Sequence, residues 1–171
     1  MRVRDHIALS TVGAALLRPW LDGGALALWA GGVLIDADHY VWFCLRERRT
    51  SPIAAMQFFS EAHPPQHSAT RALHTPAALM AAVIASLRWP QLRAAVFGMA
   101  VHIALDLCHD ARMSRARAAA LERDDFLCAE CGARAEPMDA HLAWQPWLLP
   151  SYGVQNVISL CGSCHEAAHA G

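Results

Sequence analysis

The sequence contains no lysine and has few charged residues of any kind. All 14 basic residues are arginine, and charged residues make up only 17% of a 171-residue chain with a formal net charge of −1. The absence of lysine is typical of a GC-rich genome and carries little functional information. The charge balance excludes a large basic footprint of the kind that holds nucleic-acid phosphates without sequence preference.

Long apolar runs are also missing, although hydrophobic residues make up 55% of the chain. No uninterrupted run reaches the roughly 18 to 20 residues expected of a membrane-spanning helix. We find no secretory signal peptide at the start, no internal repeat and no low-complexity tract. Apolar helices are predicted at about residues 5–21, 25–45, 76–89 and 91–108. Because four such helices fall within the first 110 residues, association of these helices with a membrane stays an open possibility.

The composition divides the chain into two parts. The length fits one ordinary domain or two small ones. Apolar stretches fill most of residues 7–108 and the remainder is more polar, so we expect domains at 1–110 and 111–171 with a boundary near residues 110–114. The second part holds five arginines against seven acidic residues. Nonspecific DNA binding should therefore be modest unless Arg112, Arg115 and Arg117 line one face.

Four of the six cysteines follow a specific pattern. They form two Cys-x-x-Cys pairs, Cys128 with Cys131 and Cys161 with Cys164. Each pair can present two thiolates to one ion, so the four predict a closed tetrahedral site for a structural Zn²⁺. A disulfide framework is the weaker alternative, because doubled Cys-x-x-Cys in a chain without a signal peptide is more often metal binding.

The surroundings of these pairs resemble the HNH endonuclease family over residues 114–171. An Arg-rich segment runs into Arg-Asp and Cys-x-x-Cys-Gly at residues 123–132, and His141 matches the middle histidine. Asn156 lies five residues before the second pair, which ends in Cys-x-x-Cys-His at His165, with His169 one helical turn on. The resemblance implies a ββα-metal module that acts on DNA with a catalytic Mg²⁺, Mn²⁺ or Zn²⁺, with His141, Asn156 and His165 as catalytic residues. His165 and His169 can share that cation, because residues four apart project from one helix face.

The chain departs from the family at the first motif. Family members usually carry two adjacent polar residues there, a metal ligand and a general base, whereas both neighbours of His141 are apolar. If His141 is the base, the cation depends on His165 and His169, with Asp139 reaching in. If His141 is a ligand, the base is missing. An alternative function is therefore a noncatalytic, zinc-stapled module for nucleic-acid or protein interaction.

Acids and imidazoles also interrupt the apolar helices of the first part. Buried ionisable groups are costly unless they pair or bind a cation. For any one of these residues a buried hydrogen-bonded pair is the simpler interpretation, but six at matching positions favour metal binding. Mixed imidazole and carboxylate ligands suit Zn²⁺, Mn²⁺ or Fe²⁺ better than Ca²⁺. We therefore expect a second metal site, for one or two ions, formed by Asp36, Asp38, His39, His74, His102 and Asp106.

Residues 1–110 resemble the bacterial membrane-bound metal-dependent hydrolase family. The matching motifs are an early histidine, His6, then Asp-x-Asp-His at 36–39, Arg-x-x-His at 71–74 and His-x-x-x-Asp at 102–106. The resemblance implies a relation in fold to zinc phospholipases. It supports a further alternative function, a membrane-associated phosphoester or lipid hydrolase that uses this His/Asp site.

Together these patterns predict a mainly α protein, in which a bundle of about four apolar helices precedes a small ββα-metal zinc module. The predicted function is metal-dependent phosphodiester hydrolysis by an HNH-type DNA endonuclease module. The expected location is the bacterial cytoplasm or the cytoplasmic face of the inner membrane. The sequence does not predict an oligomeric state.

Overall fold

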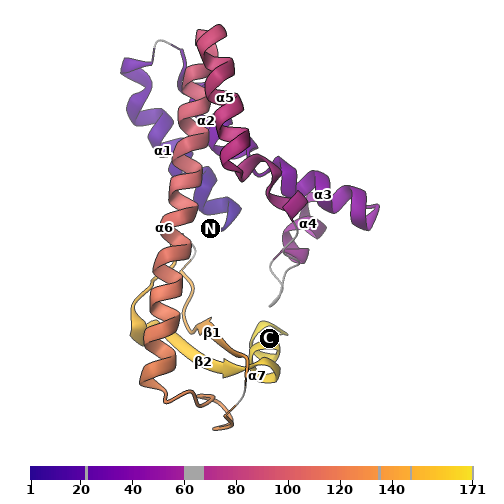
Figure 1. The fold of residues 1–171 in the computed structure, drawn as a ribbon, viewed down its shortest axis with the longest axis vertical. Helices are drawn as coiled ribbons and strands as arrows, with labels where there is room; N and C mark the ends of the chain where they lie inside the picture. Colours follow the sequence, from indigo (N-terminus) through magenta and orange to yellow (C-terminus); the bar gives the residue numbers. More distant parts are fainter. Residues whose placement is uncertain (22, 60–67, 135, 147, 171) are drawn as a thin grey trace. The chain divides into compact units, whose positions relative to one another are not determined.

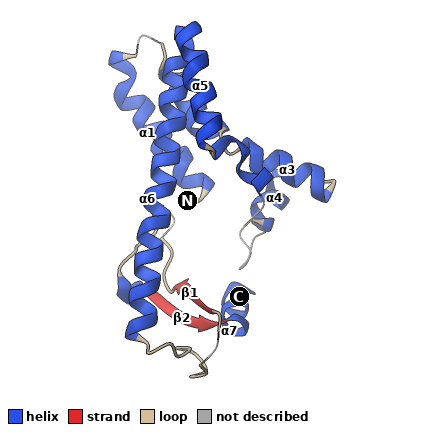
Figure 2. Cartoon of the chain, viewed as in Figure 1, coloured by secondary structure: helices blue, strands red, loops and turns tan. Residues whose placement is uncertain are grey.

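The computed structural model describes residues 1–21, 23–59, 68–134, 136–146 and 148–170 (Figures 1 and 2). It is mainly helical with one two-stranded sheet, so the predicted mainly α class is confirmed in this coarse form. The described residues divide into two compact units. Unit 1 comprises those up to Leu107, and unit 2 comprises those from Cys108 onward.

Unit 1 is built from helices and short 3-10 turns. Its helices are α1 (Val3–Leu17), α2 (Ala25–Leu34), α3 (Ala37–Glu47), α4 (Pro52–Phe58), α5 (Pro76–Arg88) and the first part of α6 (Arg93–Arg123). Its 3-10 turns are η1 (Arg18–Trp20), η2 (Ser68–His74) and η3 (Pro90–Leu92). The prediction of a bundle of about four apolar helices is not confirmed, because the described residues of this unit form helices of unequal length.

Two helices of unit 1 begin at clear capping signals. The Ser51 hydroxyl accepts a hydrogen bond from the Ala54 N–H (3.3 Å), and the Thr75 hydroxyl accepts one from the Ala78 N–H (3.1 Å). In both helices proline occupies the first helical position, where its missing N–H has no intrahelical partner to lose. The start of α5 therefore lies where the Thr75-Pro76 pair predicts it.

Two predicted helix boundaries are wrong. The helix expected over residues 25–45 is two helices, α2 and α3, which are separated at Ile35 and Asp36. The helix expected to end near residue 108 continues as α6 to Arg123, so the predicted boundary at residues 110–114 falls inside it. Residues 108–123 contain no glycine or proline and are rich in alanine and arginine, which favour helix continuation.

Helices α2 and α6 cross at backbone contact, as Figure 1 shows. A Cβ added at Gly31 would lie 1.9 Å from the Ala95 carbonyl oxygen, and one added at Gly98 would lie 2.0 Å from the Leu28 carbonyl oxygen. Both separations are far below van der Waals contact, so neither position accepts a side chain. This crossing sets the distance between two of the elements that carry the polar cluster of unit 1.

Unit 2 combines the end of α6 with a β-hairpin and a terminal helix. Strands β1 (Met138–Leu142) and β2 (Val157–Cys161) are antiparallel, with His141 opposite Ile158. The turn η4 (Val154–Asn156) leads into β2, and α7 (Gly162–Ala170) follows it. Because successive side chains of a strand point to opposite faces, the hairpin has one face with Asp139 and His141 and an apolar face with Ala140, Leu142 and Val157. The apolar face packs on α6 through Ala116, Ala120, Ala140, Leu142 and Val157.

The end of α6 is bonded to β2 by an Arg-Asp pair. The Arg123 guanidinium donates to the carbonyl oxygens of Val154 (2.7 Å) and Val157 (2.9 Å). It also pairs with the Asp124 carboxylate (2.6 Å), which accepts the Ser159 N–H (3.3 Å). These bonds fix the position of β2 relative to the segment that carries the first cysteine pair.

Candidate metal centres

The four cysteines of the two Cys-x-x-Cys pairs come together in unit 2. Their sulfur atoms all lie within 4.8 Å of one another, and the sulfurs of Cys131 and Cys161 are 3.8 Å apart. A tetrahedral ion with zinc–sulfur bonds of about 2.3 Å places its sulfurs about 3.8 Å apart. The cluster, which we call the cysteine cluster, can therefore hold a structural metal ion such as zinc.

Backbone groups assemble the cysteine cluster and favour the thiolate form of Cys128. The Ala129 N–H donates to the Ser159 carbonyl oxygen (2.8 Å), which joins the first cysteine loop to β2. Gly132 ends that loop with φ of +70°, a conformation that favours glycine. Burial raises the pKa of the Cys128 thiol, but the backbone N–H groups of Cys131 and Cys161 outweigh burial and lower it to about 6. Thiolate is the form that binds metals.

Three imidazoles meet on the face of the hairpin that carries Asp139. His141 comes from β1, and His165 and His169 come from adjacent turns of α7. Their donor nitrogens lie within 4.8 Å of one another, and the Nε2 atoms of His165 and His169 are 3.2 Å apart. Metal–nitrogen bonds of about 2.1 Å in a tetrahedral site give a separation of about 3.4 Å. This imidazole cluster therefore fits a cation, and because His169 is exposed the cluster is open to solvent.

The surroundings of His141 favour its neutral ring. Burial, followed by the charges of His169 and His165, lowers the pKa of His141. Among the described residues, the buried Nδ1 of His141 has no hydrogen-bond partner. The Asp139 carboxylate lies 3.6 Å from Nδ1 of His165. A carboxylate beside a ligand imidazole orients the ring and increases its basicity, so Asp139 is placed to assist His165.

Asn156 holds the connection that follows the His141 strand. Its side-chain oxygen accepts the Trp144 N–H (2.9 Å), and its amide donates to the carbonyl oxygens of Trp144 (2.8 Å) and Ser151 (3.0 Å). The Asn156 side chain thus holds the backbone at Trp144 and at Ser151, in the loop between β1 and β2. Its placement suits a positioning role for the hairpin rather than contact with a reacting group.

A second set of titratable side chains gathers in unit 1. Nε2 of His74 lies 3.4 Å from the Asp36 carboxylate and 3.2 Å from Nε2 of His102. Nε2 of His102 lies 3.4 Å from the Asp106 carboxylate. We call the whole set the unit 1 cluster; it includes one residue that was absent from the predicted ligands, His6. Its members are His6, Asp36, Asp38, His39, His74, His102 and Asp106.

Asp38 lies behind two imidazoles of this cluster. One carboxylate oxygen is 2.6 Å from Nδ1 of His39, and the other is 3.2 Å from Nδ1 of His74. The second oxygen also accepts the Leu73 N–H (2.9 Å). The sequence predicts Asp38 as a metal ligand, and in the structure both of its carboxylate oxygens contact imidazole nitrogens. Spacing alone does not separate the role of a ligand from that of a hydrogen-bond partner of ligands.

His6 and His102 form the buried side of the unit 1 cluster. Their rings stack with centroids 3.6 Å apart, and Nε2 of His6 lies 3.0 Å from the Asp106 carboxylate. Nδ1 of His102 lies 2.8 Å from the Gly32 carbonyl oxygen, which leaves Nε2 directed at Asp36 and Asp106. The α2–α6 crossing is what brings this carbonyl within reach. In the sequence, only the resemblance to the metal-dependent hydrolase family pointed to His6, as the early histidine of its motifs.

The unit 1 cluster is electrostatically coupled. Burial raises the pKa of Asp36 and Asp106, but contacts with His102 and other imidazoles outweigh it and hold both well below the usual range. Burial lowers the pKa of His74 and His102, but neighbouring carboxylates outweigh it and raise both to about 9. Protons on the imidazoles therefore balance the carboxylates, and a divalent cation would replace these protons.

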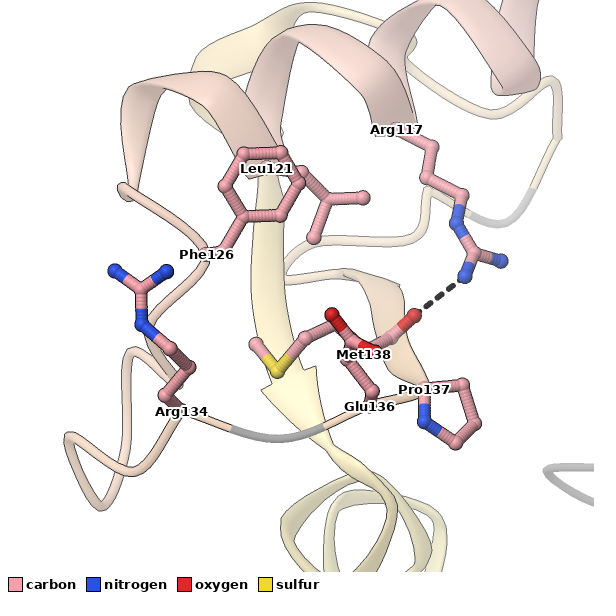
Figure 3. A pocket seen from close by; sticks show the side chains of 7 residues that line it. All are labelled: Arg117, Leu121, Phe126, Arg134, Glu136, Pro137 and Met138. Carbon is pink, nitrogen blue, oxygen red and sulfur yellow. Dashed lines mark hydrogen bonds between the residues drawn. The ribbon is translucent and has the colours of Figure 1, made fainter.

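Unit 2 also contains an arginine-lined pocket of about 740 Å³ beside the end of α6, shown in Figure 3. The guanidinium groups of Arg117 and Arg134 lie at its rim with Phe126 and the Glu136 carboxylate. Arg117 donates a hydrogen bond to the Met138 carbonyl oxygen. The lining residues are separate from those of the imidazole cluster.

One helical segment, Pro90–Arg123, is long and apolar enough by length and composition to cross a membrane. This finding does not conflict with the lack of uninterrupted apolar runs in the sequence, because Arg93 and Asp106 interrupt this segment. Comparisons of the chain with protein-family models, curated proteins and solved structures found no match. The roles of the site residues therefore rest on donor type, spacing and burial.

Proposed function

We propose that unit 2 is an HNH-type, metal-dependent endonuclease module that hydrolyses phosphodiester bonds of DNA. The observation that carries this proposal is the convergence of His141, His165 and His169 on one face of a β-hairpin and its following helix. The cysteine cluster beside them holds a structural Zn²⁺, and the three imidazoles hold the catalytic divalent cation. Four thiolates would fill every position of the first ion, whereas three imidazoles would leave a position of the second ion for water or substrate.

The side chains of this centre have distinct roles. A divalent cation held there supplies charge to the scissile phosphate and lowers the pKa of the attacking water. His165 and His169 hold the cation, and Asp139 orients His165. His141 is the third ligand, because its ring centroid lies 5.5 Å and 5.1 Å from those of the other two. With His141 as a ligand, the attacking water would give its proton to solvent as its oxygen bonds to phosphorus. The ester bond would break and the leaving oxygen would take a proton from solvent, which gives a phosphomonoester and a hydroxyl.

Contacts with DNA are expected to be few. Arg112 and Arg115 are exposed on α6, and Arg117 and Arg134 line the pocket of Figure 3. Seven acidic residues in residues 111–171 offset these charges. Because nonspecific affinity grows with the number of phosphates neutralised, we expect weak binding and cleavage that depends mainly on the cation.

The test is nicking of supercoiled plasmid DNA by the purified full chain with Mg²⁺, Mn²⁺ or Zn²⁺. We expect His165→Ala and His169→Ala to lower nicking at least 100-fold while zinc at the cysteine cluster is retained. His109→Ala is the matched control, because His109 belongs to the same unit but contacts Tyr152 instead of the imidazole cluster. Nicking that survives both variants would refute the proposal. Zinc binding without nicking under any cation would favour a noncatalytic interaction module.

A second candidate function belongs to unit 1, which we propose as a membrane-associated phosphoester or lipid hydrolase. The unit 1 cluster offers the ligands, and large apolar side chains of the same unit are exposed, including Leu16 (66%), Trp20 (75%) and Leu87 (71%). Flotation with phosphatidylglycerol-containing vesicles tests the association. We expect co-flotation that weakens in Leu16→Glu and Trp20→Glu. Recovery of the wild-type chain only in the soluble fraction would contradict the membrane part.

A further inference from the structure

We infer that the unit 1 cluster holds two divalent cations that share the carboxylate of Asp36. This inference deepens the second candidate function, hydrolysis by unit 1, and depends on it only for the substrate class. Two cations joined by one carboxylate bind an anionic oxygen substrate, such as a phosphate ester, from both sides. The inference itself concerns the number of ions and the residues that hold them.

The grouping of donor atoms supports two positions. Asp36, His39 and His74 form one group whose donor atoms lie within 4.8 Å of one another, and His6, Asp36 and His102 form another. The two groups have only Asp36 in common, and one carboxylate oxygen can bridge two ions. Each group provides two imidazoles and one carboxylate, a ligand set that leaves coordination positions open for substrate.

His6 gives an independent reason for the second ion. Its side chain is 2% exposed, and among the described residues its buried Nδ1 has no hydrogen-bond partner. A buried polar atom without a partner is destabilising, so it calls for an explanation such as a bound ion. A single ion in the competing group of His74, His102 and Asp106 would leave His6 and His39 without a ligand role.

The hydrogen-bond partners of the imidazoles fit the same arrangement. Asp38 occupies Nδ1 of His74, and the Gly32 carbonyl oxygen occupies Nδ1 of His102, so both rings keep Nε2 for an ion. Nε2 of His74 and of His102 each lie within 3.5 Å of the same Asp36 oxygen, at 3.4 Å and 3.5 Å. Asp36 is therefore positioned between one imidazole from each group.

The experiment is a Mn²⁺ titration of the full chain after removal of labile ions, with bound Mn²⁺ counted and its EPR spectrum recorded. The His165→Ala/His169→Ala double variant is the background, so that the counted ions belong to unit 1. We expect two Mn²⁺ per chain and the spectrum of an exchange-coupled pair. One uncoupled ion would overturn the inference in favour of the single-ion group. Two uncoupled ions or none would also overturn it.

Substitutions at two aspartates, two residues apart, test which carboxylate joins the ions. Asp36→Asn should abolish the coupled signal and leave at most one Mn²⁺. Asp38→Asn is the matched control, and it should keep two coupled ions while weakening binding about 10- to 100-fold, as expected for a partner of ligands. Circular dichroism verifies that both variants fold. Two coupled ions in a chain that hydrolyses no phosphate ester would refute the second candidate function and leave this inference standing.

Discussion

The two units bring ligands together in different ways. In unit 2 the cysteine and imidazole clusters come from a segment of 42 residues, 128–169, and the cysteine cluster uses four identical donors. In unit 1 the ligands extend from His6 to Asp106, and they come from four elements and a helix break. A site of the first kind is visible as a motif, whereas a site of the second kind depends on how helices pack.

The two arrangements also differ in what would replace a missing ion. Without a metal, the four cysteine sulfurs have only weak sulfur contacts, so the two cysteine loops of unit 2 lose their strongest connection. The unit 1 cluster without a metal keeps a network of protonated imidazoles and carboxylates. Loss of metal should therefore unfold unit 2 and only weaken unit 1, which the following predictions test.

The largest effect is expected from Cys161→Ala. Removal of one thiolate from a closed zinc site eliminates most of a metal contribution that amounts to about 10–16 kcal/mol in zinc-finger peptides. We expect loss of one zinc per chain by elemental analysis and loss of protection from hydrogen exchange across unit 2. The exposed Cys108 lies outside the cysteine cluster, so Cys108→Ala should keep the zinc. A Cys161→Ala protein with full zinc content would contradict the assignment.

Gly98→Ala is expected to have the next largest effect, now in unit 1. Its methyl group would meet the Leu28 carbonyl oxygen at 2.0 Å, and overpacking of this kind costs about 1–3 kcal/mol or more. Chemical denaturation followed by helical signal measures the loss. Gly13→Ala is the control, since a Cβ there meets nothing within 4 Å and should be neutral or stabilising. Equal stability of the two variants would mean that α2 and α6 do not cross as closely as described.

Asn156→Ala should destabilise unit 2 by about 1–3 kcal/mol, because it leaves an N–H and carbonyl groups of the loop without partners. The bonds lost are those to Trp144 and Ser151. Asn156→Asp keeps the acceptor for the Trp144 N–H and removes both donors. Its stability should therefore lie between that of the wild type and that of Asn156→Ala. Thermal unfolding of the zinc-loaded protein provides the measurement. Wild-type stability in Asn156→Ala would assign Asn156 a role other than positioning the hairpin.

A smaller effect is expected on the stability of metal-free unit 1 when the pH is raised. The folded-state pKa values of His74 and His102 are about 9, above the ordinary 6.5, so the stabilisation is complete below pH 6.5. It is lost as pH rises toward 9. We expect a lower Tm at pH 9.5 than at pH 6, at about 2–4 °C for each kcal/mol lost. Bound cations replace the protons, so the metal-loaded protein should show little of this drop. A metal-free Tm that rises over the same range would contradict the proposed charge states.

Much of unit 2 follows from local spacing. Paired Cys-x-x-Cys segments determine which sulfurs can share an ion, and the four-residue separation of His165 and His169 places both rings on one face of α7. The role of Asn156 is less accessible, because its hydrogen bonds go to a loop whose course the sequence leaves open. The choice between base and ligand for His141 depends on where its ring lies relative to α7, which no spacing rule determines.

Unit 1 was harder to predict because its contacts are long-range. The sequence identifies Asp36, His74 and His102 as unusual in apolar surroundings, but only the α2–α6 crossing makes Gly32 a partner of His102. The break between α2 and α3 lacks a proline or glycine at Ile35 and Asp36, so local propensity gives no warning of it. The ligand and partner roles of Asp36 and Asp38 differ only in side-chain direction.

The continuity of α6 has a practical consequence for anyone who would study the two units as separate polypeptides. Leu107 and Cys108, where the units divide, are consecutive residues inside a helix. A cut at this point would strip up to four amides and four carbonyls of their intrahelical partners. It would also create two frayed ends, one of them a single residue away from Asp106. A polypeptide that ends at Leu107 would therefore place a frayed helix end beside the unit 1 cluster.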